Sequence, residues 1–512
     1  MKSFLARFGT DVEGVLSGFD RLVFRGHLIP LIRPSGMYAF LKRTGIRLLD
    51  FKDYVSTTSD RIKKEALDTA RLLERPIRYL RSSKTNKEAL VQQLFIEQPV
   101  NEGLICLFTT VEPCMSFEYH RSEDPTQRGL KFTQRKCLHL YRYFIHRTFG
   151  LIGTRLQTWF PFNIQIWLNG REWLSVQLRE NGIDFERADN TFTFVADSDQ
   201  AQRLLTLQRA TNWPAVLAAL GKTIHPLHDD IVAAAPMDYY WSVYQSEWAT
   251  DLLFRTPSSL ARLYPRLYRH ATLHFQSPDV MRFLGRKLHG NFTGELTSRF
   301  KNRLEGVRVK HWVHGNSLKM YDKAGVVLRV ETTLADTTPF RAFRAPQNRP
   351  DDAPSWKPMR KGIADLNRRA EVSDAANSRY LDALAAVDDS QPLGEVFDRF
   401  CRPVVRAGVR TRAIRIGDPL DVALLEAISR GEFAVNGFRN RDLRPLLFSS
   451  AKPDQIKPLA AKTTRLLRLL RAHGLIQKVP KTHRYLLTPL GTQLAASLSA
   501  ARRATTRDLL AA

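Results

Sequence analysis

The side chains with the greatest capacity for chemistry lie in residues 305–334, where polar and apolar residues alternate. Successive side chains of a β-strand point to opposite faces, so this alternation predicts a three-strand antiparallel meander over 307–314, 317–322 and 326–333. One face of the meander is apolar. The other face carries cations, aromatic rings and one carboxylate: Arg308, Lys310, Trp312, Lys319, Tyr321, Arg329 and Glu331.

Two kinds of chemistry fit this polar face. A tyrosine hydroxyl beside cations can act as a nucleophile, and a carboxylate can hold a metal ion. The same aromatic and cationic side chains could stack bases and hold phosphates. We therefore name Tyr321 and Glu331 as candidate catalytic residues, and Arg308, Lys310 and Lys319 as candidate nucleic-acid-binding residues. The alternative is a charged outer sheet face without a function.

The segment KMYDKAGVVLRVETT, residues 319–333, resembles a hairpin of the rolling-circle replication initiators of plasmids and filamentous phages. This resemblance implies DNA nicking through a tyrosine together with a metal ion, Mg²⁺ or Mn²⁺. The histidine pair with which those initiators bind the metal has no counterpart here, because Leu138-His139-Leu140 lacks the second histidine. The resemblance therefore implies the reaction without identifying Tyr321 as its nucleophile.

Further carboxylates are candidates for metal binding. Glu247 and Asp251 lie four residues apart in residues 237–254, which we expect to be helical, and like charges at this spacing repel. A bound metal ion or an arginine partner would explain them, and a salt-bridged helix face is the alternative. Asp20 and Glu112 lie in strand-like segments, as do the carboxylates of RNase H-like nucleases that bind two metal ions.

Residues 457–473 predict a helix with two different faces. At about 100° per residue, the apolar set falls on one side of the helix; it comprises Leu459, Leu466, Leu467 and Leu470, with Thr463. A cationic stripe falls on the opposite side, and its members are Lys462, Arg465, Arg468 and Arg471. Leu469 falls among the cations, where we expect it to contact a neighbouring element or a thymine methyl group.

A basic hairpin is expected directly after this helix, with strands at 475–479 and 484–488. Shorter helices are expected before it at 419–430 and 440–448. Helices followed by a basic hairpin indicate a helix-turn-helix with a wing, in which the last helix enters the major groove and the wing reaches phosphates. The candidate nucleic-acid-binding residues of this wing are Lys478, Lys481, His483 and Arg484.

The runs RLLRLLRAHGLI (465–476) and RYLLTPLG (484–491) resemble the winged-helix domains of MarR-type bacterial regulators. The resemblance covers roughly residues 418–505 and implies binding to duplex DNA. A basic amphipathic helix that packs on another domain is the alternative. The whole chain also resembles a bacterial family of similar length, and this second resemblance implies no chemistry.

The charge of the chain favours a polyanionic partner. Lys and Arg number 78 against 51 Asp and Glu, which gives a net charge of +27. From residue 399 to residue 512 there are 22 Lys and Arg against 7 Asp and Glu, a net charge of +15. More than half of the excess thus lies in less than a quarter of the chain, which favours a dedicated binding surface for DNA or RNA.

Cellular location is addressed by the cysteines and by the apolar runs. The four cysteines, Cys106, Cys114, Cys137 and Cys401, lack metal-ligand spacing and are expected to be free thiols in a reducing compartment. No signal peptide and no apolar run of membrane-spanning length is evident. We expect a soluble, cytoplasmic protein that binds no membrane and could form a homodimer.

The expected fold class is α+β. The expected domains are an N-terminal α+β domain (1–197), a helical region that ends in the meander (198–336), a Pro- and Arg-rich linker with helices (337–417) and the winged helix (418–512). We expect a sequence-specific DNA-binding protein of a bacterial mobile element or replicon, with nicking or nuclease activity if a divalent metal binds. The alternatives are a non-enzymatic transcriptional regulator and a protein that binds a structured RNA.

Overall fold

The computed structural model describes residues 1–120, 122–124, 128–275, 277–286, 296–303, 306–346, 349, 351–386, 393–406, 408–449, 455–480 and 482–504. Helices and strands are mixed along the chain, as the expected α+β class requires. The chain forms two compact units, each built from separate stretches. Unit 1 comprises Met1–Gly14, Asp251–Thr332 and Asp374–Ala512, and unit 2 comprises Val15–Thr250 and Thr333–Ser373.

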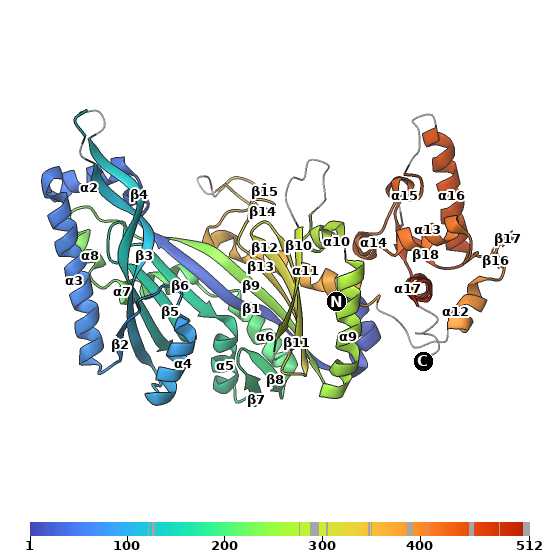
Figure 1. Ribbon diagram of the computed structural model, residues 1–512, viewed down its shortest axis with the longest axis horizontal. Coiled ribbons are helices and arrows are strands. Elements are labelled where there is room, and N and C mark those ends of the chain that lie inside the picture. The colour runs from blue at the N-terminus through green and yellow to red at the C-terminus, as the bar shows by residue number, and fades with distance from the viewer. Residues whose placement is uncertain are drawn as a thin grey trace. The chain divides into compact units, whose positions relative to one another are not determined.

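Unit 2 is built around a sheet with the strand order β9-β1-β6-β5-β4-β3-β2 (Figure 1). Neighbouring strands from β1 to β3 are antiparallel, whereas β2 is parallel to β3. The strands span Val12–His27 (β1), Ile77–Tyr79 (β2), Gly103–His120 (β3), Gly129–His146 (β4), Gly150–Gln157 (β5), Ile164–Asn169 (β6) and Tyr240–Phe254 (β9). The first residues of β1 and the last residues of β9 belong to unit 1.

Helices of unit 2 cover much of this sheet. They span Pro34–Thr44 (α2), Phe51–Leu72 (α3), Lys87–Glu97 (α4), Gly170–Glu180 (α5), Ser198–Gln208 (α6), Trp213–Ile224 (α7) and His228–Ile231 (α8). Figure 1 shows α3 alongside β3, with which it is in contact. Phe24 of β1 lies 5.3 Å, ring centre to ring centre, from Trp213 of α7. Leu22, Phe24 and Ile166 are therefore buried on one sheet face.

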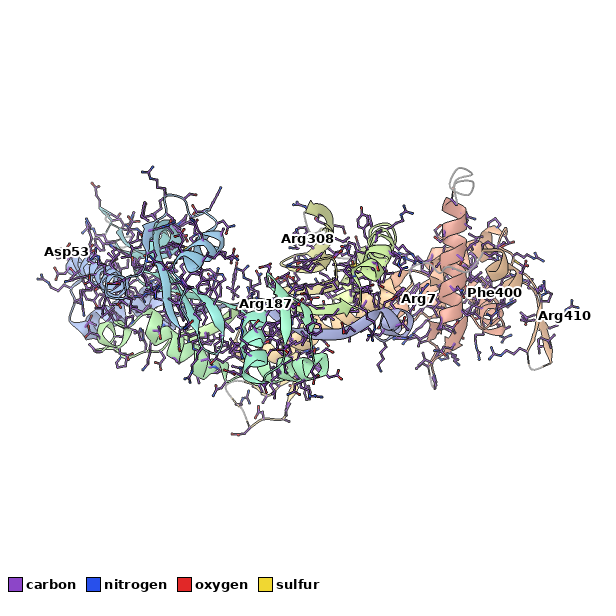
Figure 2. All side chains as sticks on the ribbon, turned by 90° about the horizontal axis from the view of Figure 1, so that it is seen from below. Arg7, Asp53, Arg187, Arg308, Phe400 and Arg410 are labelled. Carbon is purple, nitrogen blue, oxygen red and sulfur yellow. The ribbon has the colours of Figure 1, made fainter. Side chains whose placement is uncertain are left out.

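Two small hairpins complete unit 2. One joins β7 (Phe185–Ala188) to β8 (Thr191–Val195), and the other joins β14 (Arg341–Arg344) to β15 (Ser355–Pro358). Arg187 of β7, labelled in Figure 2, bonds Glu172 of α5 at 2.6 Å and so ties its hairpin to the helix.

Unit 1 contains the predicted meander. Its strands are β10 (Leu296–Arg303), β11 (Gly306–Val313), β12 (Asn316–Lys323) and β13 (Val327–Leu334), and β10, β11 and β12 pair in antiparallel order. The predicted apolar face is confirmed at Val309 and Leu328, which are fully buried. Helices α1 (Lys2–Phe8), α9 (Pro257–His274) and α10 (Ser277–Phe283) also belong to unit 1, and α9 contacts β11. Helix α11 (Leu366–Leu384) contributes residues to both units.

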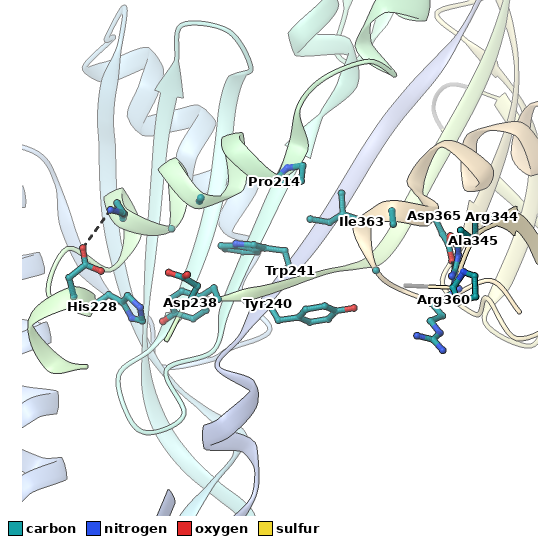
Figure 3. A pocket seen from close by; sticks show the side chains of 18 residues that line it. Pro214, His228, Asp238, Tyr240, Trp241, Arg344, Ala345, Arg360, Ile363 and Asp365 are labelled. Carbon is teal, nitrogen blue, oxygen red and sulfur yellow. Dashed lines mark hydrogen bonds and ion pairs between the residues drawn. The ribbon is translucent and has the colours of Figure 1, made fainter. Parts of the chain in front are cut away.

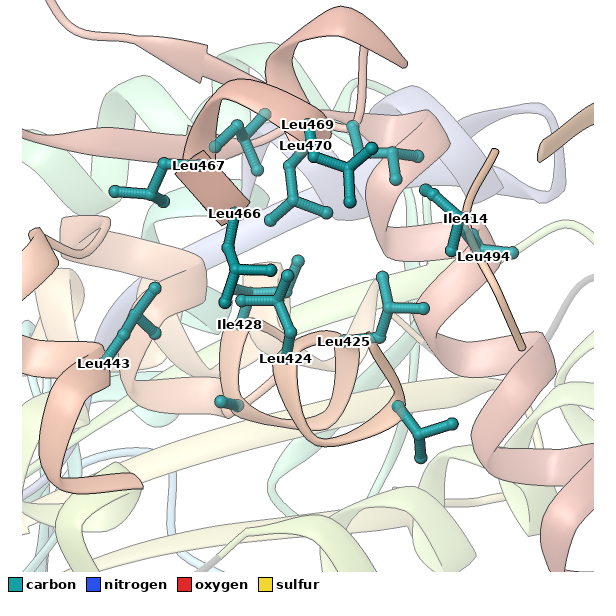
Figure 4. Packing of buried hydrophobic residues seen from close by; sticks show 14 of the residues in the cluster. Ile414, Leu424, Leu425, Ile428, Leu443, Leu466, Leu467, Leu469, Leu470 and Leu494 are labelled. Carbon is teal, nitrogen blue, oxygen red and sulfur yellow. The ribbon is translucent and has the colours of Figure 1, made fainter. Parts of the chain in front are cut away.

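The C-terminal part of unit 1 has its own hydrophobic core. Its elements are α12 (Leu393–Phe400), β16 (Val404–Arg406), β17 (Val409–Thr411), α13 (Pro419–Ile428), α14 (Gly431–Asn436), α15 (Asn440–Leu447), α16 (Ile456–Ala472), β18 (Ile476–Lys478), β19 (Tyr485–Leu487) and α17 (Pro489–Arg503). Figure 4 shows the leucines of α16 packed among side chains of α13 and α17. Asp418 caps α13 by accepting hydrogen bonds from the backbone N–H groups of Leu420 and Asp421, both at 3.0 Å.

Three sequence predictions about secondary structure are wrong. Residues 240–254 form strand β9 instead of a helix. The meander has a fourth strand, β10, before the three that alternation predicted. The expected linker with helices at 337–417 contains the β14–β15 hairpin, in which Arg341–Arg344 pairs with Ser355–Pro358. Strand β9 lies beside β1, which is far away in the sequence, and local sequence does not encode that pairing. Strands β10 and β14 pair with the strands that follow them, β11 and β15, and the alternation of their short segments did not reveal these hairpins.

Leu469, an apolar residue that the predicted helix placed among cations, is buried in the structure. It is 6% exposed and belongs to the C-terminal core, so it contacts its own domain and not a nucleic acid. Among the described residues, no helix combines the length and apolar character needed to cross a bilayer. All four cysteines are free thiols.

Candidate functional sites

The candidate catalytic residues of the meander contact one another directly. The hydroxyl of Tyr321 on β12 donates a 2.7 Å hydrogen bond to Oε2 of Glu331 on β13. The ammonium of Lys319, two residues before Tyr321, donates to the other carboxylate oxygen, Oε1. Glu331 is 1% exposed. The interpretation of this face as an outer, solvent-exposed one is therefore wrong at its centre.

The electrostatics of this cluster keep Glu331 ionised. Burial by itself raises the pKa of a carboxyl, but the charge and hydrogen bond of Lys319, with the hydrogen bond from Tyr321, outweigh burial and lower the pKa of Glu331 to about 2. An ionised, buried carboxylate holds the Tyr321 hydroxyl in one orientation. Because the ammonium of Lys319 is bonded to the same carboxylate, a tyrosine oxygen is presented close to a positive charge.

Cations of β11 lie opposite this cluster across the β11–β12 pair. Arg308 pairs in register with Tyr321, and Lys310 pairs with Lys319. Directly opposed side chains on one sheet face are about 5 Å apart at Cβ. Lys310 also lies 4.0 Å from the ring centre of Trp312. Arg308, Lys310 and Trp312 are half-buried. The face thus combines a tyrosine, an aromatic ring and several cations, as its alternation predicted.

Asp251 has the arginine partner that its sequence context suggested. Arg329 donates from Nε to Oδ1 at 2.5 Å and from Nη2 to Oδ2 at 2.8 Å, and both side chains are at most 1% exposed. A two-pronged, buried ion pair fixes the geometry of both groups and satisfies the carboxylate. This arrangement gives Asp251 a structural role that does not require metal binding.

Unit 2 brings two other carboxylates together. Carboxylate oxygens of Asp20 on β1 and Glu247 on β9 lie within 4.8 Å of each other, close enough to share one metal ion. The Nδ2 atom of Asn190 lies 3.2 Å from both oxygens of Asp20, and Arg171 lies 3.9 Å away. Gln245 donates to Oε1 of Glu247 at 2.8 Å. Oxygen ligands of this kind suit Mg²⁺ or Mn²⁺.

Glu112 does not join Asp20, as the sequence had suggested it could. Among the described residues, the group of carboxylates close enough to hold a metal contains Asp20 but not Glu112. Glu112 instead accepts hydrogen bonds from Tyr141 at 2.6 Å and from Arg155 at 3.1 Å, and Lys87 lies 3.7 Å away. Burial of this network, followed by the Glu112 hydrogen bond, raises the pKa of Tyr141.

The cationic stripe of α16 is exposed along its whole length. Lys462, Arg465, Arg468 and Arg471 are exposed, whereas the intervening Thr463, Leu466, Leu467, Leu469 and Leu470 are buried. Lys462 lies 5.4 Å from the ring centre of Phe448, and the backbone oxygen of Arg471 accepts a hydrogen bond from Arg406. All four cations of the stripe are thus exposed on the side of α16 that faces away from the core.

The hairpin after α16 carries further cations. Its strands pair from Ile476↔Leu487 to Lys478↔Tyr485. Lys478 and His483 are exposed, and Arg484 is half-buried. Lys481, which the sequence placed at the hairpin tip, lies outside the described residues. Phe438, which follows α14, bonds Tyr485 through two backbone hydrogen bonds and so anchors the hairpin to the helices.

Sequence reasoning missed a cavity of about 680 Å³ in unit 2, shown in Figure 3. Tyr240 and Trp241 line it, together with Arg360 and His228. The Nε2 atom of His228 bonds the backbone oxygen of Met237 at 2.8 Å, and its buried Nδ1 has no hydrogen-bond partner within the described structure. The volume is typical of small-molecule sites. The aromatic run at 239–241 was the only sequence signal for it.

No protein-family model matches the chain, and neither a curated protein nor a solved structure is significantly similar to it.

Proposed function

We propose that the chain is a sequence-specific DNA-binding protein of a bacterial mobile element or replicon, and that residues 418–512 form its winged-helix domain. One observation carries the proposal: Lys462, Arg465 and Arg468 are all exposed on α16, while the leucines between them are buried. A helix packed on one side and cationic on the other fits the major groove of duplex DNA, which admits an α-helix.

The two parts of the surface have different expected roles. A guanidinium on a groove-facing helix can donate two hydrogen bonds to guanine, so Arg465 and Arg468 are assigned to base reading. Lys478 and His483 on the hairpin are assigned to phosphates, which position the protein without reading sequence. The net charge of +15 over residues 399–512 supports both roles.

Selection of duplexes from a random pool tests this proposal, followed by affinity measurements on the selected site. Arg465→Ala and Arg468→Ala should each weaken binding to that site by roughly 5- to 150-fold, which corresponds to about 1–3 kcal/mol per lost base contact. Arg502→Ala is the matched control, because this exposed arginine of α17 pairs with Glu426 of α13 and does not belong to the cationic stripe of α16. Selection of no site, or equal affinity in all variants, would reject the proposal.

Phosphodiester cleavage is the second candidate function, and the Tyr321–Glu331 hydrogen bond favours it. A tyrosine hydroxyl held by a carboxylate beside Lys319 has the composition of a nucleophile site. Attack by the tyrosine oxygen on phosphorus would leave the chain covalently joined to one DNA end and release the other end as a free hydroxyl. A divalent metal would stabilise the charge that develops on the phosphate.

Supercoiled DNA that carries the selected site tests cleavage in the presence of Mg²⁺ or Mn²⁺. Nicking with a covalent protein–DNA adduct, lost in Tyr321→Phe, supports a tyrosine nucleophile. Nicking without an adduct supports attack by metal-activated water. DNA that stays intact in every condition leaves a non-enzymatic regulator as the function, and preferential binding of structured RNA would favour the RNA-binding alternative.

A further inference from the structure

The sheet of unit 2 has one face that helices leave partly open. Side chains of alternating residues on β1, β6 and β5 are buried on one face, whereas Arg21, Arg25, Trp167 and Arg155 on the other face are half-exposed. We call this second surface the open sheet face. Its accessible members are Arg21 and Arg25 of β1, Trp167 of β6, Arg155 of β5 and Tyr244 of β9. Val23, Gln165, Gly153, Tyr141 and Tyr143 lie buried between them, and Trp167 packs at the margin of a hydrophobic cluster that includes Tyr141, Tyr143 and Val91 of α4.

The strand register arranges these side chains in rows across the sheet. In one row Arg25 pairs with Gln165, Gln165 pairs with Arg155, and Arg155 pairs with Tyr141. Adjacent strands are about 4.8 Å apart, so the two arginines emerge about 10 Å apart, with one amide between them. Arg25 donates from Nε to Oε1 of Gln165 at 3.3 Å. The row therefore presents two guanidinium groups at a fixed spacing.

The neighbouring row supplies aromatic surface. Trp167 pairs with Gly153, and Gly153 pairs with Tyr143. A Cβ atom at Gly153 would lie 2.8 Å from the Tyr143 ring and 3.5 Å from the Trp167 indole, so glycine is needed for the two rings to approach. The indole also stacks on Tyr141, with ring centres 6.1 Å apart and planes inclined by 14°. Stacking on Tyr141 fixes the orientation of a half-exposed indole.

A second aromatic contact lies at the β1 end of the arginine row. The guanidinium of Arg25 lies 3.4 Å from the ring centre of Tyr244, which is 36% exposed. The ammonium of Lys361 approaches the same ring at 5.6 Å. Aromatic rings and cationic side chains thus alternate along the open sheet face. Proteins that bind single-stranded nucleic acids use such surfaces, because bases stack on the rings and phosphates bind the cations.

The charges on this face do not balance. The cations on or beside it are Arg21, Arg25 and Arg155, with Lys87 of α4 and Lys361 next to them, and the neighbouring carboxylates are Glu88 and Glu112. Glu88 pairs with Arg21, and Glu112 is shared between Lys87 and Arg155. Within the described residues no carboxylate forms an ion pair with Arg25, whose pKa is lowered by burial and then by the charge of Arg155, despite its contact with Tyr244. An anion at this position would offset that cost.

We propose that the open sheet face binds single-stranded nucleic acid, with bases stacked on Trp167 and Tyr244. The phosphates lie between Arg25 and Arg155. Duplex DNA does not fit this surface, because its bases are already stacked and cannot present their faces to a protein ring. The site uses only elements of unit 2 and does not depend on the proposed duplex recognition by α16.

Fluorescence anisotropy of the full chain with labelled oligo(dT) and oligo(rU) tests the proposal. Trp167→Leu and Arg25→Gln should each weaken binding to single strands by roughly 5- to 150-fold, since one base stacked on an aromatic side chain contributes about 1–3 kcal/mol. Arg61→Gln is the matched control, because this arginine lies on α3 of the same unit and pairs with Asp230. The control should bind like the wild type.

Comparison of oligo(dT) with oligo(rU) shows whether the ligand is DNA or RNA, because the chain should bind one of them more tightly. Arg465→Ala separates the two proposed surfaces: it should weaken binding to the selected duplex and leave single-strand binding unchanged. A parallel loss of both would assign single strands to α16 and overturn this proposal, as would equal affinity of wild type, Trp167→Leu and Arg25→Gln.

Photocrosslinking tests the same surface in the wild-type chain, so its result does not depend on whether the variants fold. Oligonucleotides that carry iodouracil, excited in complex with the protein, should attach to peptides that contain Trp167 or Tyr244. Attachment only to peptides of the meander or of the C-terminal region would reject the open sheet face as the site.

Discussion

The hydroxyl of Tyr321 is hydrogen-bonded at 2.7 Å to the buried carboxylate of Glu331. Lys319 donates to the other oxygen of the same carboxylate, so three side chains of β12 and β13 form one hydrogen-bonded cluster. The ion pair has consequences for stability that can be measured apart from any reaction. Measuring the stability of a variant without this ion pair shows how much Glu331 contributes to the fold, apart from any role in catalysis.

Glu331→Gln should destabilise the chain at neutral pH by about 3–5 kcal/mol, because it leaves the charge of Lys319 in a buried site without its carboxylate. Interactions that lower the pKa of Glu331 to about 2 stabilise the fold above the ordinary carboxyl pKa of 4.5. This contribution is lost as the pH falls from about 4.5 through about 2. Urea unfolding at pH 7, 4.5 and 3 should therefore show a gap between wild type and variant that narrows with acidification. A gap independent of pH would contradict this electrostatic account.

The Asp251–Arg329 pair allows a cleaner test of a buried ion pair. Asp251→Leu or Arg329→Met alone should each cost about 3–5 kcal/mol, because each leaves one charge buried without its partner. The double variant with Asp251→Leu and Arg329→Met should recover most of that loss, since it removes both charges together. Thermal unfolding of the four proteins measures the coupling. Additive losses would show that the two side chains do not act as a pair.

Alternation in the meander was predictable because it depends on local geometry alone. Val309 and Leu328 face the core and Lys319 and Tyr321 face away, as a two-residue period requires. Strand β9 was not predictable in this way. Its apolar and aromatic residues satisfy helical spacing as well as strand spacing, and only pairing with β1 decides between them.

The same distinction applies to the candidate functional residues: a contact within one hairpin was predictable, and contacts between distant strands were not. Tyr321 and Glu331 could be associated from the sequence, since a single turn joins their strands. The approach of Asp20 to Glu247 could not, because it depends on the pairing of strands far apart in the chain. The row formed by Arg25, Gln165 and Arg155 depends on register across three strands, and a shift of one residue would turn each side chain to the opposite face.

Divalent metal should stabilise the chain through Asp20 and Glu247. Two carboxylates within 4.8 Å repel each other, and a bound cation removes that repulsion while it binds only the folded chain. Millimolar Mn²⁺ or Mg²⁺ should therefore raise the Tm of the wild type and leave the Tm of Glu247→Gln unchanged. Without metal, Glu247→Gln should melt at or above the wild-type Tm, because the repulsion is gone. Glu180→Gln, at an exposed site on α5, should respond to metal like the wild type.

Leu469 distinguishes the core of the C-terminal region from its cationic surface. It lies between two arginine-bearing turns of α16, yet it is 6% exposed within the hydrophobic cluster. Leu469→Ala should cost about 2–5 kcal/mol of stability, as truncation of a buried leucine does. Ile456→Ala, at a 51% exposed site of the same helix, should cost much less.

Duplex affinity of Leu469→Ala, measured at a temperature where the variant is folded, should stay within about twofold of the wild type, since the side chain has no contact with DNA to lose. The dependence of its binding on salt should also be unchanged, because the number of phosphates neutralised by lysine and arginine is the same. An affinity loss as large as that of Arg468→Ala would place Leu469 in the groove, against a thymine methyl group, and would contradict its position in the core.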